Sequence, residues 1–493
     1  MESLPVLVYA AAQVRAMDRH AIDVLGIPGY ALMQRAAEAA LAMLRQQWPD
    51  ADRLTVLCGS GNNGGDGYVL ARLALEAGLS VTVCALADPE RLTGDAARAH
   101  AEFRGAGRQA AGFDRAALAT GVIVDALLGT GVDRPVEGAM RECIDAVNAS
   151  GLPVLALDLP SGLDADTGLV HGTAVIATRT VTFVALKTGL FLGDARDHVG
   201  ELAFAGLDIP AEAGEAHVPV MKRMDSQLLA AALPRRRRSA HKGEHGRVLI
   251  VGGFAMPGAA RLAGEAALRA GAGLVTVATD AAGVAPIIAG RPELICNAAE
   301  SASALESLMD SADVVAIGPG LGLGRDARTF FDAVAACGKP LVLDADALTL
   351  LAERPRHRDD WIVTPHPGEA ARLTGTDAAA IQRDRLGSLR AITARYGGIC
   401  VLKGAGTLVG AEDLPPWVCD RGNPGMATAG AGDVLTGIIA ALVAGGCDLE
   451  LAAAAGVLLH ARAGDRAARA GERGLIAGDL IAQLQAVTNP PWN

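Results

Sequence analysis

Short apolar runs alternate with helical patterns along nearly the whole chain, and this alternation limits the fold more than any other feature. In the first half, apolar runs at residues 54–58, 81–86, 122–126, 154–159 and 180–185 are strand candidates. Helical patterns, such as residues 69–77 and 140–149, lie between several of them. Continuous apolar strands separated by helices predict a parallel sheet that is covered by helices on both faces. A long helix over about residues 11–48, broken near Gly26 to Gly29, is expected before the first strand.

The alternation lapses between about residues 209 and 246. This stretch contains three prolines, the arginine run 235–238 and no long strand candidate, so it is interpreted as a linker with a lead-in helix at 226–233. A solvated linker face explains the arginine run better than a phosphate or partner contact does. Strand candidates then resume at residues 248–251, 274–278, 314–317, 341–343, 361–363 and 399–402.

Chain length supports the same division. A chain of 493 residues exceeds what a single hydrophobic core usually organises. The sequence therefore predicts two fused three-layer α/β domains, at residues 1–213 and 241–493, joined by a linker and lead-in helix at 214–240.

Composition excludes several classes of protein. The formal charge of −11 argues against a nucleic-acid binder, because that role needs a basic surface. No apolar stretch reaches the roughly 18 residues of a membrane span, and residues 1–10 lack the pattern of a signal peptide. The eight cysteines are scattered without CxxC pairs, which is typical of reduced thiols rather than a zinc site. We therefore expect a cytoplasmic protein without nucleic-acid or membrane partners.

A glycine-rich segment follows the first strand candidate. Residues 59–67 read Gly-Ser-Gly-Asn-Asn-Gly-Gly-Asp-Gly, and a helix is expected from Tyr68. Such a loop lets backbone N–H groups approach a phosphate, and it formally matches the GxGxxG pattern of dinucleotide folds. Asp66 would nevertheless repel a pyrophosphate, and Asp88 comes late for the acidic residue of that fingerprint. The match to a standard dinucleotide site is therefore poor.

Two aspartates stand at the carboxyl ends of further strand candidates. Asp125 precedes a Gly-Thr-Gly loop, and Asp158 precedes Pro-Ser-Gly. In an open parallel sheet such loops converge on one crevice, so these groups are expected to meet. Asn63, Asp125 and Ser161 would then offer oxygen ligands for a monovalent or divalent cation, and Asp158 would serve as a proton acceptor. The alternative is that each aspartate only caps a helix or turn, which explains one of them better than all together.

The strongest chemical signal lies in the second half. This signal is residues 423–437, in which a loop of small residues leads into an apolar helix expected at 434–443. Backbone N–H groups at a helix start stabilise the charge of a transferring phosphoryl group. Asp433 at this junction is placed to take a proton from a substrate hydroxyl. An N-cap aspartate is the alternative, but a cap does not require the four small residues that precede Asp433.

Three upstream loops also follow strand candidates. Residues 403–407, Lys-Gly-Ala-Gly-Thr, suit a nucleotide phosphate and ribose, and residues 318–322 form a second glycine-rich loop. In the third, residues 364–369, His366 stands between two prolines, where a substrate contact is favoured over a structural role. The sequence contains no GxxxxGK[ST] segment, so a P-loop enzyme is excluded.

The first-half motifs at residues 62–67, 129–131 and 158–162 closely resemble the N-terminal domain of bacterial bifunctional NAD(P)H-hydrate repair enzymes. The resemblance implies a Rossmann-like domain that interconverts the R and S forms of hydrated NADH or NADPH, with Asp158 as the catalytic residue. It also implies potassium binding by Asn63, Asp125 and Ser161. The implied hydrate contacts are Asn62, Asn63, Gly64, Gly65, Asp66, Gly129, Thr130, Gly131, Val132, Asp133, Arg134, Pro135 and Asp158.

The second-half motifs resemble the ribokinase-like superfamily, and within it the NAD(P)H-hydrate dehydratase branch. The resemblance rests on the Gly-Ala-Gly-Asp sequence that ends at Asp433, on residues 252–260 and on the three upstream loops. It implies ADP or ATP as phosphoryl donor, with magnesium, and Asp433 as the catalytic residue. The implied hydrate contacts are Ala259, Gly320, His366 and Asp433, and the implied nucleotide contacts are Lys403, Gly404, Ala405, Gly406, Thr407 and Gly432.

Together, the two resemblances predict one repair function. Hydroxide is a poor leaving group and a phosphate ester leaves readily, so phosphorylation of the hydrate's hydroxyl would drive its elimination. The dehydratase is expected to take only the S form, which a fused epimerase would supply from the R form. The expected partners are hydrated NADH and NADPH, ADP or ATP, and further copies of the chain in a homo-oligomer.

Two alternatives stay open. A ribokinase-like kinase of a vitamin-precursor alcohol would share the second site, but it would leave the first site unexplained. A nucleotide-sensing or scaffold protein would have degenerate sites, whereas Asp158, Lys403 and Asp433 are all present.

Overall fold

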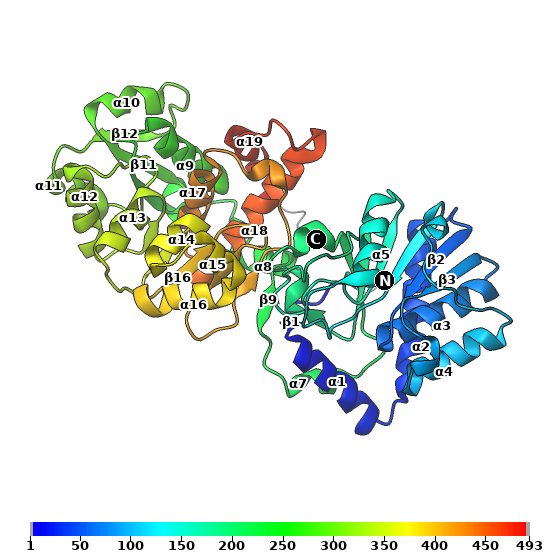
Figure 1. Ribbon diagram of the computed structural model, residues 1–493. Helices are drawn as coiled ribbons and strands as arrows, with labels where there is room; N and C mark the ends of the chain where they lie inside the picture. Colours follow the sequence, from blue (N-terminus) through cyan, green and yellow to red (C-terminus); the bar gives the residue numbers. More distant parts are fainter. Residues whose placement is uncertain (1–2, 490–493) are drawn as a thin grey trace. The chain divides into compact units, whose positions relative to one another are not determined.

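A computed structural model describes residues 3–489 and divides the chain into two compact units, residues 1–222 and 223–493 (Figure 1). The division falls inside the stretch expected to be a linker. That stretch contains strand β9 (Met221–Arg223) and helix α8 (Ser226–Ala232), which lies where the lead-in helix was expected. Within residues 3–489, no helix is both long and apolar enough to cross a bilayer.

The first unit is built on a parallel sheet with the strand order β3-β2-β4-β5-β6-β8. Five of these strands were expected from the apolar runs, and β8 was not. Their bounds are β2 (Arg53–Cys58), β3 (Ser80–Ala85), β4 (Val122–Ala126), β5 (Val154–Leu157), β6 (Arg179–Phe183) and β8 (Glu201–Ala205). A smaller strand β1 (Leu7–Tyr9) pairs in parallel with β7 (Leu186–Lys187) and antiparallel with β9.

Helices cover both faces of this sheet. Alternate residues of β4 contribute to two hydrophobic cores: Val122 and Val124 to one, and Ile123 to the other. Helices α2, α3 and α4, which lie side by side in Figure 1, pack on the first core, and α5 packs on the second. The helices are α1 (Ala11–Asp23), α2 (Gly29–Gln47), α3 (Asn62–Glu76), α4 (Gly94–Gly105), α5 (Gly138–Ala149), α6 (Ala195–His198) and α7 (Glu212–Glu215). The three-layer prediction is confirmed for this unit.

The glycine-rich segment after β2 was expected to be a loop up to Gly67, and this expectation is wrong. Helix α3 begins at Asn62, so most of the segment is helical. Its glycines serve close packing: a Cβ on Gly64 would lie 2.3 Å from the carbonyl oxygen of Gly59, and a Cβ on Gly67 would lie 2.7 Å from the Cβ of Ala126. The small residues therefore allow the first turns of α3 to lie directly on the ends of the strands.

The second unit has a sheet of order β12-β11-β10-β13-β14-β15-β16-β17-β18. Pairing is parallel from β12 to β16 and antiparallel from β16 to β18. The apolar runs predicted six of these strands but missed β12, β17 and β18. The bounds are β10 (Arg247–Val251), β11 (Leu274–Thr279), β12 (Ile295–Ala298), β13 (Val314–Ile317), β14 (Leu341–Leu343), β15 (Trp361–Val363), β16 (Ile399–Leu402), β17 (Leu408–Gly410) and β18 (Trp417–Val418).

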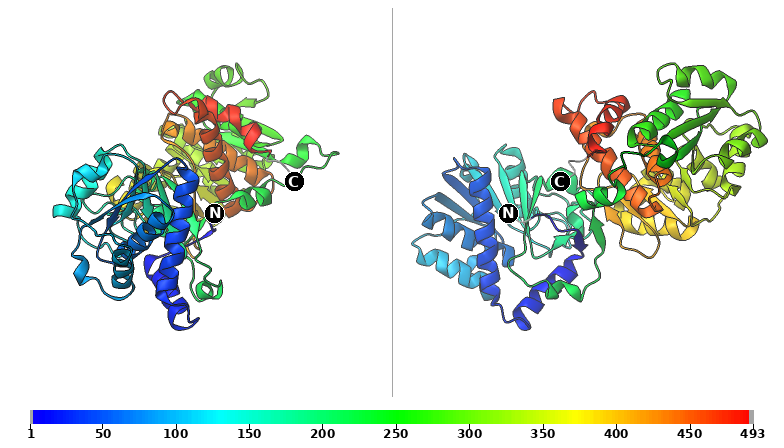
Figure 2. Two further views of the ribbon diagram at one scale, coloured as in Figure 1. Left: turned by 90° about the vertical axis from the view of Figure 1, so that its right-hand side faces the viewer. Right: turned by 180° about the vertical axis from the view of Figure 1, so that it is seen from behind.

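A hydrophobic core rich in alanine joins this sheet to helices α8, α9, α17, α18 and α19. The rear view in Figure 2 shows α17 to α19, coloured orange to red, lying together in this unit. Helices α9 and α17 approach so closely that a Cβ on Gly437 would lie 2.0 Å from the carbonyl oxygen of Ala263. The helices after α8 are α9 (Pro257–Ala270), α10 (Ala281–Ile288), α11 (Ala302–Asp310), α12 (Arg325–Ala336), α13 (Asp346–Glu353), α14 (Pro367–Thr374), α15 (Ala378–Arg383), α16 (Arg385–Tyr396), α17 (Ala431–Ala444), α18 (Leu449–Ala467) and α19 (Ala477–Val487).

Candidate active sites

In the first unit, the loops that follow β4 and β5 are joined through Asp125. Its Oδ1 accepts a hydrogen bond from Ser161 Oγ at 2.6 Å and one from the Leu127 N–H at 3.2 Å, and its Oδ2 accepts from the Ser161 N–H at 2.8 Å. Complete burial raises the pKa of Asp125 to about 6, although these hydrogen bonds favour its charged form. The two strand ends therefore meet, as parallel topology requires.

Asn63 reaches the same place from the start of α3. Its Nδ2 donates to the carbonyl oxygen of Leu128 at 2.9 Å, and the N–H of Leu128 donates to Ser161 Oγ at 2.8 Å. The Oδ1 atom of Asn63 is buried and has no hydrogen-bond partner within residues 3–489. Buried polar atoms are rarely left unpaired, and an amide oxygen beside a carboxylate and a hydroxyl is a suitable ligand for a hard cation. Asn63, Asp125 and Ser161 thus offer oxygen atoms of the type that a potassium ion takes.

Asp158 has a strained backbone and a one-sided set of partners. Its φ of 65° lies in the left-handed region, which costs a non-glycine residue about 1–3 kcal/mol. Oδ1 forms an ion pair with Lys187 and accepts from Thr182 Oγ1 and from the Phe183 N–H, both at 3.2 Å. No hydrogen bond reaches Oδ2 from the part of the chain that the structure describes. One carboxylate oxygen is therefore held while the other is available.

A cavity of about 670 Å³ opens over Asp158, a volume within the usual range for small-molecule sites. Gly64 and Gly65 do not line it, because they pack beneath it. Of the expected substrate contacts, those that line it are Asn62, Asn63, Asp66, Gly129, Thr130, Gly131, Val132, Asp133, Arg134, Pro135 and Asp158. The cavity is also lined by Asp18 and Lys187, which the sequence interpretation did not single out.

Two carboxyl groups in this cavity have raised pKa values. Burial raises the pKa of Asp18 to about 6, with Lys187 opposing this and Asp158 adding to it. Burial also raises the pKa of Asp66 well above its usual range, and the neighbouring Asp158 and Asp18 raise it further. Both groups therefore retain protons into a higher pH range than an ordinary carboxyl group does. The cavity thus holds carboxyl groups with different proton affinities, as general acid–base chemistry requires.

Lys187 had a detectable signal in the sequence, but Asp18 did not. Lys187 is the only charged residue between Arg179 and Asp194, and a lone lysine in an apolar stretch predicts a buried ion pair. Asp18 belongs to the polar sequence of α1, where an aspartate most often faces solvent. Only the packing of α1 beside the cavity distinguishes it.

In the second unit, α17 begins at Ala431, three residues earlier than expected. Gly430, with φ of 86°, is the N-cap residue, and Asp433 lies in the first turn. The alternative of an N-cap aspartate is therefore wrong. Burial raises the pKa of Asp433 to about 7, and nearby Asp344 raises it further while Lys403 lowers it. A carboxylate with a pKa near neutrality is well suited to act as a general base.

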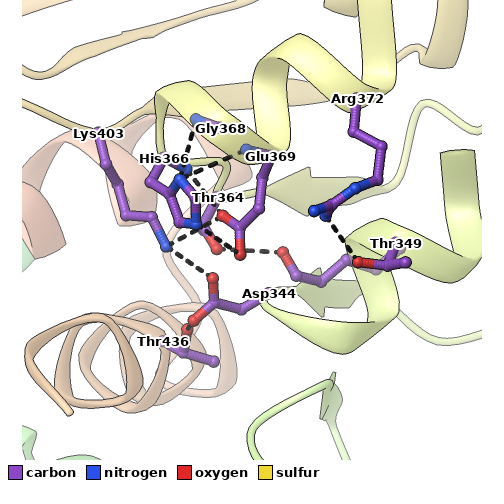
Figure 3. A network of polar contacts seen from close by, with 10 residues as sticks. Asp344, Thr349, Thr364, His366, Gly368, Glu369, Arg372, Lys403 and Thr436 are labelled. Atoms are coloured by element: carbon purple, nitrogen blue, oxygen red, sulfur yellow. Dashed lines mark hydrogen bonds and ion pairs between the residues drawn. The ribbon is translucent and has the colours of Figure 1, made fainter. Parts of the chain in front are cut away.

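Lys403 lies at the centre of a buried polar network (Figure 3). Its Nζ is 2.8 Å from Asp344 Oδ1 and 3.7 Å from Glu369 Oε2, and Thr436 Oγ1 donates to Asp344 Oδ2 at 2.7 Å. Burial alone would raise the pKa of Asp344, but Lys403 and Thr436 hold it below its usual value. Asp344 and Lys403 follow strands β14 and β16, and Thr436 belongs to α17, one turn beyond Asp433. The network therefore connects the ends of these two strands to α17. Asp344 was missed, although it stands at a strand end as Asp125 does.

His366, which was expected to be a substrate contact rather than a structural residue, has a structural role. It is the N-cap of α14, where its Nδ1 accepts from the N–H groups of Gly368 at 3.0 Å and Glu369 at 3.3 Å (Figure 3). Burial lowers the pKa of His366, as does nearby Lys403, in keeping with Nδ1 being an acceptor. The side chain is still 56% exposed, although its Nε2 lies 3.5 Å from Glu369 Oε1.

The remaining expected ligand contacts of the second unit lie in two places, each formed by a loop and the first turn of a helix. Gly320 accepts hydrogen bonds from the N–H groups of Ala255 and Met256, just before the first turn of α9, which contains Ala259. The loop after β16 is shaped by Arg385, a buried side chain whose Nη2 donates to the carbonyl oxygens of Leu402 and Lys403 at 3.0 and 3.3 Å. In that loop, Thr407 Oγ1 donates to the carbonyl oxygen of Gly404, while Ala405 and Gly406 complete the turn. Gly432 faces the loop: a Cβ there would lie 3.4 Å from Lys403 Nζ.

These features define a class of protein. One unit of this α/β chain has a cavity with acid–base groups. In the other unit, a carboxylate of raised pKa in the first turn of a helix lies beside a lysine. Such a chain is a bifunctional enzyme. The second site is typical of phosphoryl transfer.

Comparison with known proteins gives the family. Residues 248–486 match the family described as NAD(P)H-hydrate dehydratase, and residues 29–189 match the family described as YjeF-related protein N-terminus. A bifunctional NAD(P)H-hydrate repair enzyme of Coxiella burnetii is 47% identical over 488 residues, which cover 98% of this chain and 100% of that protein. The Escherichia coli protein of the same name is 45% identical over 491 residues, covering 99% and 95% respectively. The chain belongs to the family of bifunctional NAD(P)H-hydrate repair enzymes, and the resemblance seen in its motifs is confirmed.

A solved structure supports the fold of the second unit. A ribokinase-like superfamily protein of Enterococcus faecalis is similar with a TM-score of 0.51 at 30% identity, covering 55% of this chain and 96% of that one. The expected ribokinase-like sheet is therefore confirmed.

Proposed function

We propose that this chain repairs hydrated NADH and NADPH in two steps. The first unit interconverts the R and S hydrates, and the second removes water from the S hydrate by a nucleotide-dependent phosphorylation and elimination. The observation that carries the proposal is the position of Asp433 in the first turn of α17, with a pKa raised to about 7, beside Lys403 and Gly432. The bifunctional repair enzymes are similar to this chain over nearly its full length, and this similarity supports the proposal for both units.

In the second unit, Asp433 takes the proton of the hydrate's hydroxyl group while the hydroxyl oxygen attacks the terminal phosphorus of ADP or ATP. The bond from that phosphorus to the bridging oxygen breaks, and AMP or ADP leaves with the electron pair. The phosphate ester then leaves with the electron pair of its C–O bond, and loss of a proton from the neighbouring carbon restores the double bond. The N–H groups at the start of α17 stabilise the transferring group, and residues 403–407 hold the nucleotide. Ala259, Gly320 and His366 line the hydrate's side of this site.

Magnesium bound with the nucleotide would neutralise phosphate charge. Asp344 is occupied by Lys403 and Thr436, and Glu369 by Lys403 and the N–H of His366. Phosphate oxygens and water would therefore supply most ligands of such an ion, as is usual for magnesium.

In the first unit, Asp158 is the base. Asp158 lines the cavity, and its partners on Oδ1 fix the carboxylate's orientation and leave Oδ2 without a hydrogen bond from residues 3–489. Potassium held by Asn63, Asp125 and Ser161 would order the loop at residues 129–135 through the shared contacts of Leu128. The unpaired Oδ1 of Asn63 supports this assignment.

The test is to incubate the protein with hydrated NADPH and either ADP or ATP while following the absorbance of the restored dihydronicotinamide. Nucleotide-dependent recovery of that absorbance, with release of inorganic phosphate, is expected. Accumulation of a stable phosphorylated alcohol would instead favour a vitamin-precursor kinase. No turnover of either epimer with either nucleotide would contradict the proposal and favour a nucleotide-binding protein without catalysis.

A further inference from the structure

Epimerisation of the hydrate requires a proton acceptor and a proton donor. Water adds to the double bond of a dihydronicotinamide at the carbon next to the ring nitrogen, since that nitrogen stabilises positive charge there. The hydrated carbon is therefore a hemiaminal, and it is the centre that is R or S. Opening the bond between this carbon and the nitrogen removes the stereochemistry, provided that the hydroxyl loses a proton and the nitrogen gains one.

Lys187 is not available as the donor. Its ammonium group has three protons, and its Nζ donates to Asp158 Oδ1, to Thr182 Oγ1 at 3.0 Å and to the carbonyl oxygen of Phe183 at 2.8 Å. Its side chain is only 2% exposed. Lys187 is therefore a positioning residue, which fixes Asp158 but has no proton directed at a ligand.

Helix α1 places another carboxyl group on the cavity. One face of α1 lines the cavity with Val14, Arg15, Asp18 and Ile22. Arg15 fixes this face against the loop at residues 129–135 by donating to the carbonyl oxygen of Thr130 at 3.0 Å. Within residues 3–489 no hydrogen bond engages the Asp18 carboxyl, yet it interacts electrostatically with Lys187 and Asp158. A carboxyl group without a hydrogen-bond partner among the described residues thus lines the same cavity as Asp158.

We propose that Asp18 is a second catalytic residue of the first unit, the proton donor that works with Asp158 across the cavity. The proposal rests on the epimerase activity proposed above. Asp158 Oδ2 takes the hydroxyl proton, the O–H electron pair forms a C=O bond, and the C–N pair returns to the ring nitrogen, which takes the proton of Asp18. After rotation about the bond to the opened aldehyde carbon, the reverse steps close the ring on the other face and restore both carboxyl groups.

Asp66 is the competing donor, because it lines the same cavity. Its pKa is raised well above the usual range, so it holds its proton more strongly and is better suited to donate a hydrogen bond than to transfer a proton. The pKa of Asp18, raised to about 6, lies nearer to neutrality. The charged groups that face Asp18 or belong to segments in contact with α1 are Arg15, Arg19, Asp66, Asp133, Arg134, Asp158, Asp166, Lys187, Glu212 and Glu215.

The experiment measures R-to-S exchange by chromatography, above the spontaneous background and without nucleotide, so that the second unit is inactive. Asp18→Asn is expected to lower kcat by roughly 10²–10⁴-fold with little change in KM, as for loss of a general acid. The alkaline limb of the wild-type pH profile of kcat/KM, with a midpoint at or above about 6, should disappear in this variant. Asp18→Glu should recover part of the rate. Asp23→Asn, on the exposed end of the same helix, is the matched control and should retain the wild-type rate.

Exchange by Asp18→Asn within threefold of wild type would overturn the proposal while leaving the epimerase function in place. A larger loss in Asp66→Asn than in Asp18→Asn, with the alkaline limb lost only in Asp66→Asn, would overturn it in favour of Asp66. Failure of the wild-type protein to exchange the epimers would instead contradict the proposed function itself.

Discussion

At the scale of single residues, the two sites depend on aspartates whose surroundings differ. Asp158 is paired with Lys187, whereas Asp18, Asp66 and Asp433 have raised pKa values because burial disfavours their charged forms. Sequence position made Asp158 and Asp433 candidates, since each follows a strand or precedes a helix in a recognisable motif. It could not identify Asp18, because nothing local shows which face of α1 meets the cavity.

Asp433→Asn tests the general base of the second unit. It should lower the turnover of S hydrate by roughly 10²–10⁴-fold and leave nucleotide affinity, measured by calorimetry, nearly unchanged. Because the base must be ionised, wild-type kcat/KM should rise with pH through about 7. A variant that binds nucleotide normally and turns over within about threefold of wild type would show that Asp433 is not the base.

The same variant should also be more stable than wild type at alkaline pH. The pKa of Asp433 in the folded state is raised from 3.8 to about 7, so the folded protein binds more protons than the unfolded chain between these values. The stability that Asp433 contributes is therefore lost as pH rises through about 7, and asparagine does not have this loss. Thermal unfolding at pH 5 and pH 8 should show the Asn variant gaining on wild type at the higher pH, and an opposite trend would contradict the assigned shift.

At the scale of helices and strands, the apolar runs were sufficient for the main sheets but not for their edges. Strands β1, β7, β17 and β18 are two or three residues long, and the edge strands β8 and β12 include polar residues such as Glu201 and Asn297. The start of α3 was missed because glycine is normally unfavourable in a helix, whereas here close packing against Gly59 and Ala126 requires it. At the start of α3, tertiary packing therefore outweighs the low helix propensity of glycine.

The approach of α17 to α9 can be tested at Gly437. A Cβ at this position would lie 2.0 Å from the carbonyl oxygen of Ala263, so Gly437→Ala must displace α17 and with it Asp433 and Thr436. We expect the second unit to lose about 1–3 kcal/mol of stability and most of its dehydratase activity. Gly478→Ala, in α19 with open space around it, is the control and should be neutral or slightly stabilising. Equal behaviour of the two variants in thermal melts would contradict the close approach.

At the scale of the whole molecule, the proposed repair pathway needs two units that each fold. Helix α8 supplies Leu228 and Leu229 to the core of the second unit, although the sequence interpretation assigned it to the linker. A fragment of residues 221–493 should therefore fold and dehydrate S hydrate alone. A fragment beginning at residue 241 should be much less stable, because each of these leucines contributes about 1.5–3 kcal/mol on burial. An inactive or insoluble longer fragment, beside an active full chain, would count against independent units.

The measurement that tests the account most directly starts from pure R hydrate of NADPH, with ADP or ATP, and compares wild type with Asp158→Asn and Asp433→Asn. Wild type should convert all of the R hydrate to NADPH. Asp158→Asn should dehydrate added S hydrate normally but use R hydrate only at the rate of spontaneous epimerisation. Asp433→Asn should equilibrate R and S and stop there. Rapid conversion of R hydrate by Asp158→Asn, or loss of both activities in either variant while the protein stays folded, would contradict two sites acting in sequence.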